Sequence, residues 1–148
     1  ISPALSAKYS HAPDYADVAK AAVAEMVRQC PRPVFDGDEA EDPIEEGLLM
    51  RQGVIVRHLL LPGCTRDSKA VIKYLYETYG NQIYLSIMNQ YTPLENVSAY
   101  PELNRKVTDE EYEEVVDYAI GLGVEQGFIQ EGETAKESFI PAFDGEGV

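Results

Sequence analysis

Cysteine and basic residues are scarce in this chain. Of its 148 residues only 2 are cysteines and 12 are lysine or arginine, against 26 aspartates and glutamates. Cys30 and Cys64 provide neither a disulfide framework nor a paired metal motif. The net charge of -14 argues against nucleic acid or an anionic membrane surface as a partner, because both require clustered positive charge.

Long apolar runs and signature motifs are also missing. No run approaches the roughly 20 residues of a membrane-spanning helix, and no signal peptide is visible, so we expect a cytoplasmic protein with no membrane partner. The sequence contains no glycine-rich phosphate fingerprint, no H-E-x-x-H, no G-x-S-x-G and no paired C-x-x-C. The length suits a single domain over 1–148.

One acidic stretch, Asp36–Glu46, has no apolar period. Its carboxylates lack the ordered spacing of a calcium-binding loop. We interpret it as an exposed loop, and a metal site there is the less favoured alternative.

The most informative stretch is the apolar run Gly53-Val-Ile-Val-Arg-His-Leu-Leu-Leu-Pro-Gly63. An apolar run bounded by glycine and proline is typical of a parallel strand covered on both faces. Adjacent residues of a strand point to opposite faces, so Arg57 and His58 cannot both face outward. We expect one of them to point into the centre of the fold.

Helical and strand periodicities alternate along the rest of the chain. Val54 begins a strand–helix–strand–helix–strand order, which predicts an α/β fold with right-handed crossovers and a parallel sheet. A helical stripe of Tyr15, Val18, Ala19, Ala22, Val23 and Met26 marks an earlier helix. The expected elements are a helical turn within 1–11, helices over 14–29, over 66–79 and after Thr108, and strands at 34–35, 48–50, 83–88 and 124–130.

Candidate functional residues lie where strands end. In parallel α/β folds the working residues gather at the carboxyl ends of the strands, where Asn89, Gln90 and Tyr91 follow the predicted strand 83–88. The amides suit the recognition of a heterocycle or ribose, or they cap a loop; Tyr91 stacks on a base or simply packs. The Arg57 guanidinium suits a carboxylate or phosphate.

Each of the remaining candidates has a structural alternative. Arg57 could equally form a structural ion pair, and His58, the weaker candidate for binding an anion, could be a hydrogen-bonded core histidine. Cys64 stands next to a predicted helix start, where the pKa of a thiol can be depressed, but no base accompanies it. The residues alone therefore predict a polar pocket and no particular reaction.

Several strings resemble radical S-adenosylmethionine enzymes of the pyruvate formate-lyase activating type. The resemblance runs through nearly the whole chain and is carried mainly by the combination of Gly53–Gly63 with Leu85-Ser-Ile-Met-Asn-Gln-Tyr-Thr-Pro93. The ending Phe139-Ile-Pro-Ala-Phe-Asp144 with Gly147-Val148 resembles the same family, and the upstream stretches Lys8-Tyr-Ser-His-Ala-Pro-Asp-Tyr15 and Ala19–Gln29 fit it as well.

The resemblance implies a partial, TIM-like (β/α) barrel that binds a [4Fe-4S] cluster through a C-x-x-x-C-x-x-C loop. Reductive cleavage of S-adenosylmethionine would give a 5′-deoxyadenosyl radical that abstracts hydrogen, in activating enzymes from a glycine of a partner protein. Carried over by position, Arg57 would help to hold the methionine end of the cofactor. Asn89, and less surely Gln90, would border the adenosine, and His58 is a weaker cofactor-binding candidate.

The cysteine spacing departs from that family pattern. Cys30 and Cys64 do not form the cluster loop, so the chain resembles the carboxyl-terminal half of such an enzyme. We expect the fragment alone to be inactive, to hold no cluster, and to self-associate through an exposed barrel edge. The alternatives are a non-catalytic α/β ligand-binding or interaction module and, less favoured, part of a barrel enzyme for a phosphorylated sugar.

Overall fold

The computed structural model describes residues 2–37, 47–93, 97 and 99–129, and the statements below concern those residues. A three-stranded parallel sheet has the order β3 (Val54–Leu59), β4 (Ile83–Met88) and β5 (Gly127–Ile129). β3 and β4 pair without a shift, from Val54 opposite Ile83 to Leu59 opposite Met88. The α/β class and the parallel sheet predicted from the sequence are therefore confirmed.

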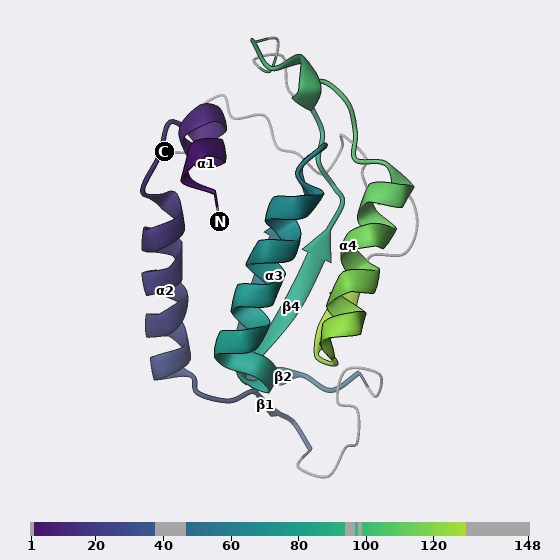
Figure 1. Cartoon of the computed structure of the whole chain (residues 1–148). Coiled ribbons are helices and arrows are strands. Elements are labelled where there is room, and N and C mark those ends of the chain that lie inside the picture. Colours follow the sequence, from purple (N-terminus) through teal and green to yellow (C-terminus); the bar gives the residue numbers. More distant parts are fainter. Residues whose placement is uncertain (1, 38–46, 94–96, 98, 130–148) are drawn as a thin grey trace, which may run out of the picture.

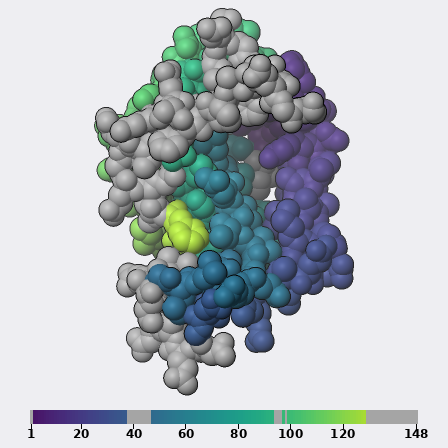
Figure 2. Space-filling view, turned by 180° about the vertical axis from the view of Figure 1, so that it is seen from behind, coloured from purple at the N-terminus to yellow at the C-terminus, as the bar shows by residue number. Residues whose placement is uncertain are grey.

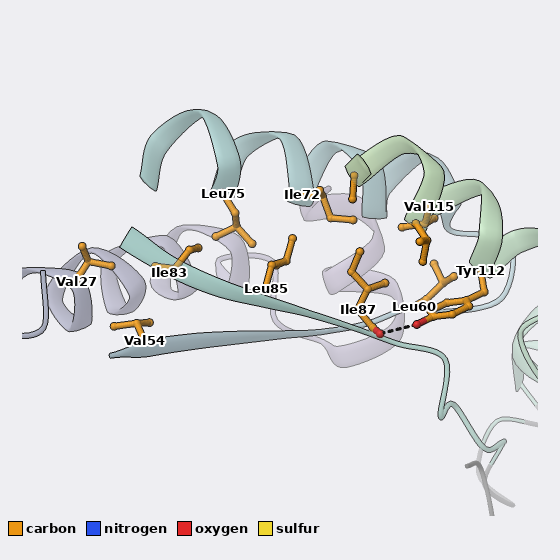
Figure 3. Close-up of a cluster of buried hydrophobic side chains, with 12 residues drawn as sticks. Val27, Val54, Leu60, Ile72, Leu75, Ile83, Leu85, Ile87, Tyr112 and Val115 are labelled. Carbon is orange, nitrogen blue, oxygen red and sulfur yellow. Dashed lines mark hydrogen bonds between the residues drawn. The ribbon is translucent and has the colours of Figure 1, made fainter. Parts of the chain in front are cut away.

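The crossover helices pack on one face of this sheet. α3 (Thr65–Tyr79) joins β3 to β4, and α4 (Asp109–Leu122) joins β4 to β5. Both lie side by side over β4 (Figures 1 and 3). Alternate residues of β4 meet them because side chains alternate across a strand. The buried cluster comprises Val27, Val54, Leu60, Ile72, Leu75, Ile83, Leu85, Ile87, Tyr112, Val115, Val116 and Ala119.

Local sequence signals fix the ends of α4. The Thr108 side chain accepts a hydrogen bond from the Glu111 N–H, and the Glu111 side chain accepts one from the Thr108 N–H, which completes the predicted capping box. The helix ends at Gly123, whose φ of 95° favours glycine. Along the predicted stripe Tyr112, Val115, Val116 and Ala119 are buried, whereas Ile120 is exposed.

Helices α1 (Pro3–Ser10) and α2 (Tyr15–Gln29) precede the sheet. α1 has eight residues rather than the single turn predicted. α2 confirms the helix predicted over 14–29, but Tyr15 and Val18 of its apolar stripe are 63% and 60% exposed. Val27 is the only residue of α2 that is buried. α2 lies beside the edge strand β3, so only one side of its apolar stripe faces the sheet.

The opposite face of the sheet is only partly covered. At its amino-terminal end the Tyr84 ring contacts Phe35 and Phe128, with ring centroids 5.7 and 5.6 Å apart. Further along, Ile55 and Leu59 of β3 remain 46% and 41% exposed. The prediction that β3 is covered on both faces is therefore wrong, because its crossover helices occupy one side.

Phe35 belongs to a small antiparallel pair, β1 (Val34–Phe35) with β2 (Met50–Gln52). β2 begins where the predicted strand 48–50 was expected to end. β5 is shorter than the predicted 124–130, of which residue 130 lies outside the described part. None of the described helices combines the length and the apolarity needed to cross a membrane.

Replacing Ile72 by alanine tests the core. Ile72 has no exposed surface, so Ile72→Ala should lower the free energy of unfolding by about 2–5 kcal/mol. The matched control is Ile120→Ala on the exposed side of α4, where Ile120 is 58% exposed and the change should stay within about 0.5 kcal/mol. Urea unfolding measures both; equal losses would contradict this packing.

Candidate functional site

Arg57 lies on the sheet face that the helices leave open. Its neighbours in β3, Val56 and His58, point toward the helices, and Arg57 is exposed opposite Ser86 in the strand register. No ion pair or hydrogen bond links Arg57 to another side chain in the described part of the chain. An exposed guanidinium in this position can accept a carboxylate or phosphate ligand.

The half-buried residues Asn89 and Gln90 come directly after β4, at the carboxyl edge of the same sheet. The strand pairing continues to this edge, because the Leu60 N–H donates to the Met88 carbonyl at 2.9 Å. Tyr91 is held by the donation of its hydroxyl to the Leu103 carbonyl at 3.0 Å. The structure therefore places Arg57 on β3 and Asn89 and Gln90 just beyond the end of the adjacent strand β4, with Tyr91 in a packing role.

Glu111 ties together the two loops that leave this edge. Its carboxylate accepts the Gly63 N–H at 2.8 Å and two hydrogen bonds from Arg105 at 2.7 Å each. The Arg105 guanidinium lowers the pKa of Glu111 to about 2, so the carboxylate is charged at neutral pH. The sequence signals only the capping role of Glu111. Its contact with Gly63 spans 48 residues, and no local pattern reports it.

His58 belongs to the other face of β3. It lines a cavity of about 280 Å³ between β3, α3 and the helices α1 and α2. Its buried Nε2 atom has no hydrogen-bond partner in the described part of the chain, and burial lowers the pKa of His58 to about 4. The imidazole is therefore neutral at pH 7. The side chains of Arg57 and His58 point to opposite faces of β3, as the strand alternation predicts, although both residues line this cavity at the edge of the strand.

Cys64 lines the same cavity. Burial raises its pKa, and the carboxylates of Asp67 and Glu111 add to the effect. The thiol is therefore not activated, and the suggestion of a depressed pKa at the helix start is wrong. Within the described ranges no three His, Cys, Asp or Glu side chains gather as metal ligands. Of the acidic stretch 36–46, residues 38–46 lie outside the described part, and Asp36 pairs with Arg51 at 2.6 Å.

Comparisons with known proteins return no family. No family model matches the chain, and no curated protein and no solved structure matches it significantly.

The buried imidazole predicts a pH dependence of stability. The unfolded chain protonates His58 near pH 6.5 and the folded chain only near pH 4. Stability should therefore fall as pH decreases from 6.5 to 4, by up to about 3 kcal/mol, since one pKa unit corresponds to about 1.4 kcal/mol.

Urea unfolding between pH 7 and 4 measures this loss. His58→Gln should remove it from the pH profile. His11→Asn should retain it, because His11 is exposed and asparagine tolerates its left-handed backbone, with φ of 52°. Identical pH profiles for His58→Gln and the parent would show that His58 is not buried as described.

Proposed function

We propose that this chain is the carboxyl-terminal half of a partial (β/α) barrel in a radical S-adenosylmethionine enzyme of the activating type. The observation that supports it most is the winding of the sheet. β3, β4 and β5 lie in chain order and both crossover helices cover one face. Barrels are wound in this way around the whole sheet, whereas in a doubly wound sheet only each βαβαβ half is wound so and the two halves place their helices on opposite faces.

The open face fits the cofactor in its polar groups. The Arg57 guanidinium is positioned to bind the carboxylate of the methionine moiety, because a planar fork binds carboxylates bidentately. Asn89 and Gln90 offer donors and acceptors for adenine and ribose at the end of β4. When bound to the complete enzyme, S-adenosylmethionine supplies the radical that abstracts hydrogen, in activating enzymes from a glycyl-radical protein partner. His58 has no part in this site because it faces the helices.

The iron–sulfur cluster does not fit the residues of this chain. A C-x-x-x-C-x-x-C loop needs three cysteines, and the chain has two. Cys30 follows α2 and Cys64 precedes α3, in separate parts of the sequence. The proposal therefore assigns the cluster to another part of the complete enzyme and leaves the isolated chain inactive. It also expects copies of the isolated chain to associate through the exposed edge of β3.

One observation favours a second candidate, a non-catalytic α/β ligand-binding module. The cavity beside His58 lies between β3, α3, α1 and α2, and neither Asn89 nor Gln90 is among the residues that line it. A module that binds its ligand there would not depend on these two amides.

Binding of S-adenosylmethionine distinguishes these functions. Isothermal titration of the chain should detect binding, and Arg57→Ala should weaken it at least about tenfold, because a hydrogen bond to a charged group contributes roughly 1.5–3 kcal/mol. Arg51→Ala is the control. Arg51 is exposed on β2, the strand that precedes β3 in the sequence, and it pairs with Asp36. Absence of binding, or equal affinity for the Arg57→Ala variant and the parent, would contradict the proposed cofactor site.

A further inference from the structure

A groove runs along the outer edge of β3. It is the cavity of about 280 Å³ described above, hereafter the edge groove, and it is many times larger than the roughly 10–15 Å³ that one water occupies. A hollow is visible in Figure 2 between the purple helices and the teal atoms of β3. The four consecutive residues 56–59 line it. Because their side chains alternate between faces, the groove follows the edge of the strand rather than one face.

Backbone groups of β3 face this groove. The Leu60 N–H donates to the Met88 carbonyl, and hydrogen-bonding direction alternates along a strand, so Val56 and His58 also bond toward β4. The N–H and C=O groups of Ile55, Arg57 and Leu59 must then point to the opposite edge. No described strand pairs there. Unpaired strand edges are templates for another strand.

The course of the chain indicates how such a strand would be connected. The Ser2 N–H donates to Asp67 in the first turn of α3, at 2.8 Å, so the chain enters α1 near the carboxyl end of β3. α1 and α2 then lead back to the amino-terminal end, where Val27 and Val54 share the core. Parallel strands are joined by right-handed crossovers. With helices on the face used by α3 and α4, a strand leading into α1 belongs on the free edge of β3.

We propose that the edge groove receives a strand parallel to β3, contributed by the polypeptide that leads directly into Ser2. This inference rests on the proposed barrel half and names the segment that continues its sheet. The strand would pair with the backbone of Ile55, Arg57 and Leu59.

The lining of the groove specifies the side chains of this strand. Its helix-facing residues would be apolar, because Val56, Ala19, Val23 and Val71 line the groove. One polar group among them would face His58, whose buried Nε2 atom has no partner among residues 2–37, 47–93, 97 and 99–129. A peptide with charged residues at every helix-facing position would not fit.

Hydrogen exchange of single amides tests the insertion. The 148-residue chain is compared with the longest polypeptide that its gene encodes. In the longer polypeptide the amides of Ile55, Arg57 and Leu59 should exchange at least about 100-fold more slowly. The amides of Val56 and His58, which bond to β4, should change little and serve as internal controls.

Two tryptophan variants in the longer polypeptide locate the strand. Ala19 lines the edge groove and Ala22, one turn along α2, is exposed. Ala19→Trp should fill the groove and restore fast exchange at the three edge amides, whereas Ala22→Trp should not. Equal exchange in the two polypeptides, equal effects of the two variants, or a gene without coding sequence before Ile1 would overturn the inference.

The outcomes also separate this inference from the cofactor site. Protected edge amides without any binding of S-adenosylmethionine would refute the proposed function and keep the inserted strand. Binding that depends on Arg57, with edge amides that remain unprotected, would refute the inserted strand and keep the cofactor site.

Discussion

The burial of one face of β4 under α3 and α4 organises the described part of this protein. Ile83, Leu85 and Ile87 point into the helices, and the Tyr112 hydroxyl donates to the Ile87 carbonyl at 3.0 Å inside that layer (Figure 3). Burying apolar surface in this way is the main favourable term in folding. Because both crossovers use the same face, the other face and the outer edge of β3 are left for other contacts.

This asymmetry separates the roles of two adjacent residues. Arg57 stays exposed on the open face, where a free guanidinium can meet an anionic ligand. His58 is enclosed by helices and its pKa is lowered to about 4, so it is a neutral imidazole, and its Nε2 atom has no partner among the described residues. At the carboxyl edge, Glu111 links the loops after β3 and β4 through its hydrogen bonds with Gly63 and Arg105. The two loops are therefore joined by charge-assisted hydrogen bonds.

The sequence predicted the elements well where an apolar run is continuous or a local capping signal is strong. The strand 83–88 and the capping box at Thr108 are found where the sequence places them, and the alternation of Arg57 and His58 follows from strand geometry alone. The helical period could not predict that Tyr15 and Val18 of α2 are exposed. An apolar stripe does not show whether another element packs against it. The Glu111–Gly63 contact could not be predicted, since it depends on how two crossovers align in space.

We propose that this chain is one half of a cluster-dependent barrel enzyme, and sequencing the gene upstream of the codon for Ile1 tests this proposal. We predict an open reading frame with a C-x-x-x-C-x-x-C loop within roughly the preceding hundred codons, a span consistent with a small domain. A start codon immediately before Ile1, with no such loop, would contradict it and leave a binding module whose ligand occupies the surface around Arg57 or the groove beside His58.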